Sequence, residues 1–434
     1  MLVRYHRGLW LAVASLMALT SLRTAVAAEP NVESPAELTL EALLAHAEGH
    51  APLIALDAAN DARIRAARAA AGNVLPENPE LWVGVGPRLE GGRAGVDFAV
   101  GVSQRFEIGG ERAARLRLAD AVKKGIQAES RDRRWDLHTT IHALFYKALV
   151  ARERVVLAER VVVFQEEIAT IVGKQRKAGQ VSQLNERVAQ AESANARQQL
   201  TALVQTELAL RQELALVVGW GPATPPVPKG TLTPVTGLAP LAELIALAAE
   251  RRPDLAVLDA TVARARAEIQ SADRDKTPEP VIGLAWTRES APAGGDASHV
   301  IIATVGLPLP FVSNNEPARA QARASLEVAL AERQRASAAI AGQVTRAYQA
   351  ATASTRRLEA FGNEVLPRFE ENLGALKRAY ELGEIDILGL ASGRERFLDA
   401  KRDALAAQED YFTALAELEH AVGVDVIDSH KEER

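Results

Sequence analysis

The sequence contains no cysteine among its 434 residues and few aromatic side chains. Without cysteine there is no disulfide, no thiolate nucleophile, no cysteine-ligated metal and no acylated lipobox cysteine. Aromatic residues make up only 4% of the chain, which argues against large packed cores. The net charge of −5 arises from interspersed acids and bases, so nucleic acid is not an expected partner.

Long apolar runs are scarce as well. The run at residues 9–19 is too short to span a bilayer as a stable helix, and no later run reaches 18 apolar residues. It follows Arg4 and Arg7 and precedes small residues, which is the pattern of a secretory signal peptide. We therefore expect residues 1–28 to be removed by cleavage near Ala28.

Most of the remaining sequence is rich in alanine, arginine, glutamate and glutamine with helical periodicity. Residues 111–178 contain no proline, and apolar residues between Leu137 and Val162 recur in steps of four and three, as in a coiled-coil seam. A helix of this length extends for about 100 Å. A helix at residues 181–218 follows after the breaker Gly179.

Two segments before this helix have a different period. Residues 96–106 alternate between apolar side chains and small or polar ones, and residues 81–88 are also β-like. Strands of this length match the span of a membrane β-strand. Trp82 and Trp286, on the first strand of each pair, are compatible with an interfacial aromatic belt and with packing inside a barrel.

The second half of the chain repeats the first at an offset of about 200 residues. The equivalent pairs are Pro52 and Pro253, Pro79 and Pro280, Gly179 and Gly383, and Gly219 and Gly423. The expected division is a signal peptide at 1–28, a first repeat at 29–226, a second repeat at 227–423 and a tail at 424–434.

Each repeat is expected to contain two strands and one helical tip. The first has strands at about 80–88 and 96–107 and a tip at about 177–182; the second has strands at about 280–288 and 299–309 and a tip at about 382–386. The helices before the strands and after the tip together nearly equal the long helix in length. We therefore predict one continuous and one broken helical rod per repeat, with the short helices and the proline-rich linker gathered at the break.

Four strands with open edges are stable neither in water nor in lipid. Three chains would supply 12 strands, which is within the range of outer-membrane barrels. The predicted fold class is mainly α with a small β part. It consists of tandem-duplicated long helical hairpins, forming an α-barrel in a trimer, plus four strands per chain in a shared 12-stranded transmembrane β-barrel.

Three segments carry a resemblance to a known family: 103–112 (SQRFEIGGER), 307–311 (LPLPF) and 380–384 (YELGE). With the duplicated layout, they make the chain resemble the TolC-type outer-membrane efflux proteins, in particular the CzcC-like heavy-metal branch. The resemblance implies a homotrimer in the outer membrane that extends into the periplasm. It also implies docking to a periplasmic membrane-fusion adaptor and an inner-membrane pump, with passive conduction of substrate. A periplasmic coiled-coil structural or metal-binding protein without channel activity is the alternative.

The two tips are the predicted docking sites for the adaptor. The residues concerned are Lys177, Gly179, Gln180, Leu382, Gly383 and Glu384. In the family, a charged Arg and Asp near the second tip help to close the entrance, whereas Ile385 and Ser392 occupy those places here. Glu384, Asp386 and Arg394 are the candidates for an altered entrance gate.

Two pairs of histidines have the i, i+4 spacing that can chelate a metal on a helix: His46 with His50, and His138 with His142. Two ligands make a poor site, so ordinary surface or interface histidines are expected and no metal site is predicted. No nucleophile–base arrangement and no phosphate-binding loop is evident, so neither catalysis nor a cofactor is predicted.

Overall fold

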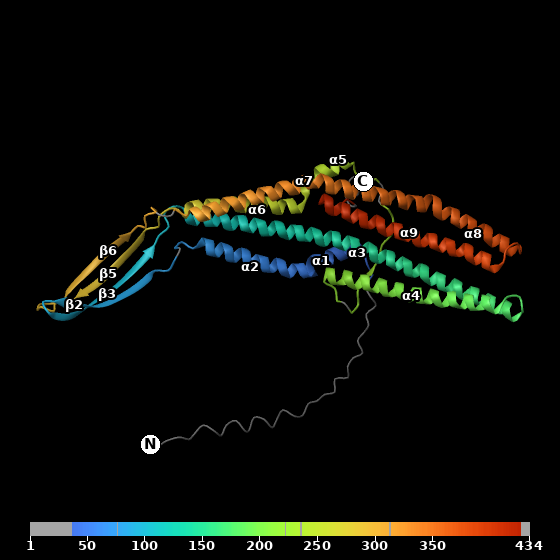
Figure 1. Cartoon of the computed structure of the whole chain (residues 1–434), viewed down its shortest axis with the longest axis horizontal. Helices are drawn as coiled ribbons and strands as arrows, with labels where there is room; N and C mark the ends of the chain where they lie inside the picture. Colours follow the sequence, from blue (N-terminus) through green and yellow to red (C-terminus); the bar gives the residue numbers. More distant parts are fainter. Residues whose placement is uncertain (1–36, 76, 222, 235–236, 312–313, 427–434) are drawn as a thin grey trace, which may run out of the picture. The chain divides into compact units, whose positions relative to one another are not determined.

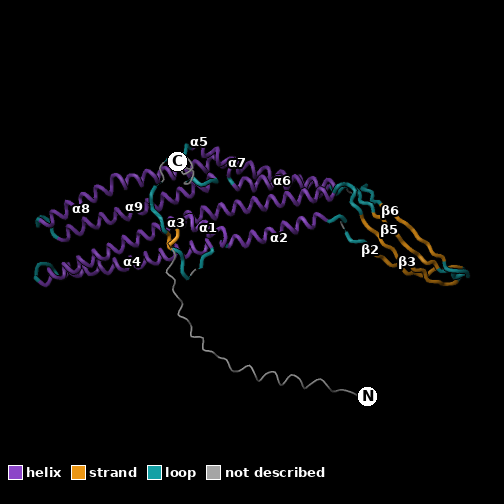
Figure 2. Tube along the Cα trace, turned by 180° about the vertical axis from the view of Figure 1, so that it is seen from behind, coloured by secondary structure: helices purple, strands orange, loops and turns teal. Residues whose placement is uncertain are grey.

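The computed structural model describes residues 37–426, except residues 76, 222, 235–236 and 312–313. The predicted signal peptide and most of the predicted tail lie outside the described residues. The described residues are mainly helical, with a four-stranded sheet beyond one end of the helices and two tips at the other (Figures 1 and 2). This arrangement agrees with the predicted fold class.

The first repeat begins with the short strand β1 (Glu37–Leu38). Its further elements are α1 (Leu40–His50), α2 (Pro52–Gly72), β2 (Glu80–Glu90), β3 (Arg93–Arg105), α3 (Glu111–Lys177) and α4 (Gln183–Val218). Thr39 begins α1, because its side chain accepts a hydrogen bond from the Ala42 amide. Proline at the first position of α2 fixes the bend between the two helices.

The second repeat follows the short strand β4 (Val227–Pro228) of the linker. Its elements are α5 (Leu241–Arg251), α6 (Pro253–Arg274), β5 (Val281–Glu289), β6 (Ser298–Gly306), α7 (Glu316–Ala360), α8 (Leu366–Glu381) and α9 (Ile387–Val422). The sequence predicted one long helix over 318–382, but a π-helical turn at Phe361–Val365 separates α7 from α8. Pro367 explains it, because proline has no N–H to donate to the carbonyl four residues earlier.

The predicted continuous and broken rods are confirmed. In the first repeat, α2 and α4 both pack along α3; in the second, α6 packs along α7, and α9 packs along α7 and α8 (Figure 1). Helix α3 also contacts α6 and α9, and so joins the two repeats. Helix α5 also packs on α7, and apolar side chains stay exposed on α4 (Leu216) and on α7 (Val328).

The predicted belt at the break is also present. In the first repeat, Leu43 of α1 belongs to one buried cluster with Phe145 of α3 and Leu214 of α4, against which Leu232 of the linker packs. In the second, α5 contributes Leu244 to the equivalent cluster with α7 and α9. The linker strand β4 pairs in parallel with β1, which ties the linker to the start of the first repeat.

Strands β2, β3, β5 and β6 form one antiparallel sheet in the order β2-β3-β5-β6. One face carries large apolar side chains that are exposed, including Val85 (72%), Ile301 (73%) and Val305 (75%). The outer edges of β2 and β6 have no partner strand within the described chain. None of the described helices is long and apolar enough to cross a membrane.

The opposite face of the sheet carries small and charged side chains. Arg88 of β2 forms ion pairs with Asp97 of β3 (2.9 Å) and Glu289 of β5 (3.0 Å), and so connects three strands. Trp82 also lies on this face, where its ring covers Gly101 so closely that a Cβ there would lie 2.6 Å from the indole. Trp286 faces the apolar side instead, against Phe98. The two tryptophans, expected as equivalents, therefore have different environments.

Candidate functional site

The two helical tips have the same backbone turn. At the first, the Gly179 amide donates to the Arg176 carbonyl (3.0 Å) and the Gln180 amide to that of Gln175 (2.9 Å). At the second, the amides of Gly383 and Glu384 make the equivalent bonds, of 3.0 and 2.8 Å, to carbonyls of α8. Both glycines have φ of +76°, which an L-residue rarely adopts. This Schellman-type turn closes both helices before the chain reverses.

The residue that begins the returning helix is also equivalent in the two tips. The Ser182 hydroxyl accepts a hydrogen bond from the Asn185 amide (3.2 Å), and the Asp386 carboxylate accepts one from the Gly389 amide (2.8 Å). Each side chain therefore satisfies one of the free amides of a helix N-terminus. Because both turns are closed and both helices capped, the tips are well-defined structures of equal length.

The two tips differ in charge and present exposed side chains. The first tip carries Lys174, Arg176 and Lys177 in the last turn of α3 and Glu186 in the first turn of α4. The second carries Arg378 in the last turn of α8, followed by the acids Glu384 and Asp386. Lys177, Gly179, Gln180, Leu382, Gly383 and Glu384, the predicted docking residues, are all exposed. Leu382 is 75% exposed and Leu184, just after the first tip, is 68% exposed. The first tip is therefore the more basic and the second the more acidic, and each has an exposed leucine.

Beneath the tips, the two hairpins pack against each other. Val172 of α3 and Ile387 of α9 are buried in one cluster, with Tyr380 of α8 packed against it. The Gln165 amide of α3 also donates to Glu395 of α9 (3.3 Å). These contacts hold the tips of one chain next to each other.

The three candidate gate residues are not grouped in this structure. Asp386 caps α9, and Glu384 is exposed. The guanidinium of Arg394 lies over the ring of Phe164 of α3, 4.0 Å from its centroid. Arg394 therefore connects the two hairpins of its own chain, whereas Asp386 has a structural role in beginning its helix.

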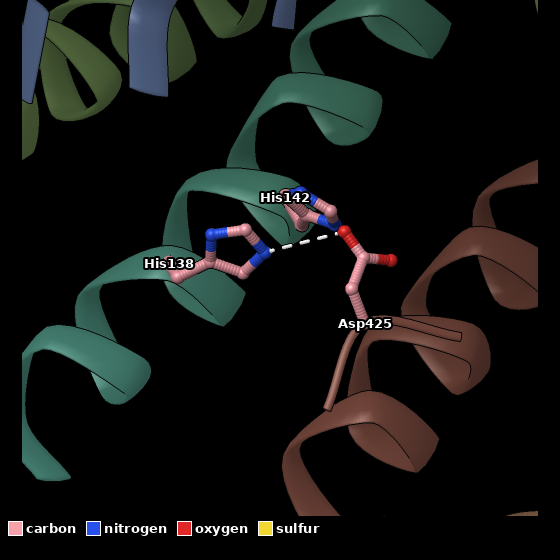
Figure 3. Close-up of side chains that lie close together, drawn as sticks. All are labelled: His138, His142 and Asp425. Carbon is pink, nitrogen blue, oxygen red and sulfur yellow. Dashed lines mark ion pairs between the residues drawn. The ribbon is translucent and has the colours of Figure 1, made fainter. Parts of the chain in front are cut away.

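A second site lies near the middle of α3, where the sequence suggested only a pair of ligands. His138 and His142 of α3 approach Asp425, which follows the end of α9, so that one ligand atom of each lies within 4.8 Å of the others (Figure 3). Nε2 of His138 is 3.6 Å from the Asp425 carboxylate. The prediction that no metal site exists did not include this third ligand.

A buried carboxylate contacts His142 on the side away from solvent. Glu419 of α9 is fully buried, and one of its oxygens is 3.0 Å from Nδ1 of His142. Burial raises the pKa of the Glu419 carboxyl, although the hydrogen bond with His142 opposes the change. Sequence reasoning missed Glu419 and Asp425 because they lie more than 270 residues from His142 in the chain.

The other histidine pair has a different environment. The rings of His46 and His50 stack with their centroids 4.1 Å apart, and Nδ1 of His50 is 3.1 Å from the His46 carbonyl oxygen. Trp220 lies against His46 at 4.6 Å. Burial lowers the pKa of His46, and the neighbouring imidazole adds to the effect. No carboxylate completes a three-ligand group here among the described residues.

Comparison with known proteins finds sequences similar to this chain. Residues 244–424 match the family model described as outer membrane efflux protein. The cobalt-zinc-cadmium resistance protein CzcC of Cupriavidus metallidurans (strain ATCC 43123 / DSM 2839 / NBRC 102507 / CH34) is 25% identical over 319 residues, which is 72% of each chain.

Solved structures share the fold of the described chain. The CmeC outer membrane channel of Campylobacter jejuni gives a TM-score of 0.72 at 14% identity, covering 91% of this chain and 89% of the other. A membrane protein from Pseudomonas aeruginosa gives a TM-score of 0.69 at 19% identity, covering 90% of this chain and 91% of the other.

These findings confirm the predicted resemblance, the fold class, and the location in the outer membrane with an extension into the periplasm. The family is one of efflux proteins rather than enzymes. Residues 244–424 thus match the outer membrane efflux protein family, and the chain has the fold of the TolC-type outer-membrane channels.

Proposed function

We propose that this protein is the outer-membrane channel of a tripartite efflux system and passively conducts heavy-metal cations from a periplasmic adaptor and an inner-membrane pump to the exterior. The observation that carries the proposal is the sheet with open edges and an exposed apolar face. Such a sheet needs both partner strands and a lipid-like environment. The alternative, a periplasmic coiled-coil protein, leaves this apolar face in water.

A homotrimer satisfies these needs. Three copies bring the sheet to 12 strands, so that β6 of one chain pairs with β2 of the next and no edge remains free. The apolar face then contacts lipid, and the face with Arg88, Asp97 and Glu289 lines the lumen. On the helices, apolar side chains remain exposed on both outer sides, such as Leu216 (70%) on α4 and Val328 (57%) on α7. Neighbouring chains would cover these side chains in the trimer.

The tips are the proposed adaptor-docking sites. Six tips of a trimer would alternate between the basic first tip, with Lys177, and the second tip, with Glu384. An adaptor with alternating acidic and basic positions around a ring would be complementary to this pattern. The exposed Leu382 would supply apolar contact area at the centre of each second tip.

The entrance gate must differ from the Arg–Asp arrangement implied by the resemblance, because Ile385 and Ser392 carry no charge. We propose that Arg394 controls the entrance by holding the second hairpin on Phe164, with Glu384 and Asp386 supplying charge at the rim. Movement of the second hairpin would require this contact to separate. Unchanged single-channel conductance and closing in Arg394→Ala, Glu384→Gln and Asp386→Asn would exclude the proposal.

Heavy-metal cations are the proposed substrates because CzcC, the relative similar over most of its length, is named for cobalt, zinc and cadmium resistance. The protein is not proposed to catalyse a reaction or to bind an organic cofactor. The proposed domain division remains a signal peptide at 1–28, repeats at 29–226 and 227–423, and a tail at 424–434.

Extraction of outer membranes with detergent, followed by size analysis with detergent correction, tests the channel proposal. A trimer that forms conducting pores in planar bilayers is the expected result. Recovery as a freely soluble monomer would contradict it. A strain that lacks this chain is expected to become sensitive to zinc, cobalt or cadmium while drug sensitivity is unchanged; the reverse pattern would refute the proposed substrate class.

A further inference from the structure

The group formed by His138, His142 and Asp425 is separate from the proposed docking tips. At 1.5 Å per residue, the 41 residues of helix and turn from His138 to Gly179 correspond to about 60 Å. The group connects α3 of the first repeat to the segment that follows α9 of the second. It is therefore placed at the junction of the two repeats, away from the tips.

The donor set is the first argument for a metal ion. Two imidazoles and one carboxylate are the three protein ligands of many zinc sites, in which a fourth position is open to water. With metal–ligand bonds of about 2.0–2.1 Å, tetrahedral ligand atoms lie about 3.3 Å apart. Nε2 of His138 and the Asp425 oxygen are already 3.6 Å apart, and the whole group lies within 4.8 Å. Only small side-chain rotations are needed to bring the three atoms together.

The partners of the ligands are the second argument. Nδ1 of His142 lies 3.0 Å from a carboxylate oxygen of Glu419, and a carboxylate on one ring nitrogen is the usual partner that orients an imidazole whose other nitrogen binds a metal. Nε2 of His138 is buried and has no hydrogen-bond partner, although it is aimed at Asp425 (Figure 3). A buried nitrogen without a hydrogen-bond partner is uncommon in folded proteins. Nε2 of His46 is another example, but that of His138 differs because a second imidazole and a carboxylate lie beside it.

The surroundings of the group are the third argument. His142 is 3% exposed and therefore fixed by packing, whereas His138 and Asp425 are 27% and 22% exposed. An ion can therefore enter from solvent on the side of His138 and Asp425, whereas His142 is held in place on the buried side. Asp425 and the buried Glu419 place two carboxyl groups beside the two imidazoles, and a mixed set of nitrogen and oxygen donors suits a divalent cation such as zinc.

We propose that His138, His142 and Asp425 form a resident binding site for one borderline divalent cation, with zinc as the best fit, which fastens the end of α9 to the middle of α3. The proposal does not depend on what the channel transports. Imidazole ligands favour zinc, cobalt, nickel and copper over magnesium and calcium. A bound ion at this place would stabilise the junction between the two repeats.

The test uses the full chain, purified in detergent without a histidine tag, stripped with a chelator and titrated with zinc chloride. Calorimetry and elemental analysis are expected to give one zinc per chain, and zinc is expected to raise the melting temperature. Cobalt(II) as a probe is expected to give the visible absorption of a tetrahedral site. A stripped protein that takes up no zinc would overturn the proposal.

Three substitutions and one control locate the site. His138→Gln and Asp425→Asn each remove a partly exposed ligand, and each is expected to abolish one-to-one binding while the helical circular dichroism is kept. Glu419→Gln is expected to weaken binding by about 10- to 100-fold, as loss of a ligand's hydrogen-bond partner does.

His50→Gln is the matched control, because it removes one member of the other i, i+4 pair, which has no third ligand among the described residues. It is expected to leave zinc affinity unchanged. If zinc binding survives His138→Gln and Asp425→Asn, or is lost equally in the control, the assignment is wrong. Should His138→Gln fail to fold, Asp425→Asn alone decides, since Asp425 lies beyond the end of α9.

Discussion

Replacing Gly219 with alanine is expected to weaken the protein more than the same change at a helical tip. Gly219 ends α4 with φ of +75° and lies against the bend between α1 and α2. A Cβ at this position would overlap the His50 carbonyl oxygen and lie 2.6 Å from its carbon. The second repeat has the same arrangement, in which a Cβ on Gly423 would lie 2.8 Å from Cα of Arg252.

The expected magnitude has two parts. A left-handed conformation costs an L-residue about 1–2 kcal/mol. The added methyl group also meets backbone atoms that cannot rotate away, and overpacking of this kind costs about 1–3 kcal/mol. Gly219→Ala is therefore expected to lower the free energy of unfolding by about 2–5 kcal/mol in total.

Gly179→Ala is the matched control for this prediction. Gly179 has nearly the same φ, +76°, but nothing lies within 4 Å of a Cβ placed there. It is expected to lose only the backbone contribution, about 1–2 kcal/mol. Guanidinium unfolding of the purified protein, followed by circular dichroism at the helical band, measures both changes. The reasoning is refuted if Gly219→Ala destabilises the protein no more than Gly179→Ala does.

Three further changes test other parts of the structure. Burial would raise the pKa of Asp57, but hydrogen bonds from α3, including one of 2.6 Å from a serine, lower it overall. The carboxylate therefore stabilises the fold at neutral pH and stops doing so as the pH falls through its lowered pKa. Asp57→Asn should destabilise by about 1–3 kcal/mol at pH 7, and pH-dependent unfolding should show no difference from the parent in strong acid. Asp386→Ala removes the cap of α9 and is expected to cost about 1 kcal/mol and to speed amide exchange at the second tip, whereas Asp386→Asn should keep both near normal. Gly101→Val displaces the Trp82 ring and is expected to lower the melting temperature of the detergent-purified protein. Gly86→Val is the control on the same face of the sheet, because no atom lies within 4 Å of a Cβ placed at Gly86, and it should not lower the melting temperature. Equal effects of the two changes would contradict this reasoning.

The lengths and order of the elements were predictable because they depend on local pattern. Proline at 52 and 253 begins a helix, glycine at 179 and 383 ends one, and both effects are properties of the residue itself. The period-two pattern at residues 96–106 likewise required a strand whose faces differ. The missed π-helical turn before Pro367 is also local, and the proline itself was the signal for it.

The metal-ligand group was not predictable in the same way. The pair His138 and His142 is visible in the sequence, since i, i+4 spacing places both on one helix face. Asp425 and Glu419 join it only because α9 packs along α3, and no sequence pattern assigns one acid among many to that place. The roles of Asp386 as a helix cap and of Arg394 on Phe164 likewise became clear only from their contacts.

The sequence by itself determined the duplication, the helical rods, the strand pairs and the two tips, because periodicity and helix breakers act over a few residues. Only the tertiary structure decided which side chains from the two repeats meet. The reason is that a helix can present many faces to its neighbours, and packing of the whole chain selects among them. Because α3 packs against α9 as well as α6, Glu419 and Asp425 lie beside His142 and His138.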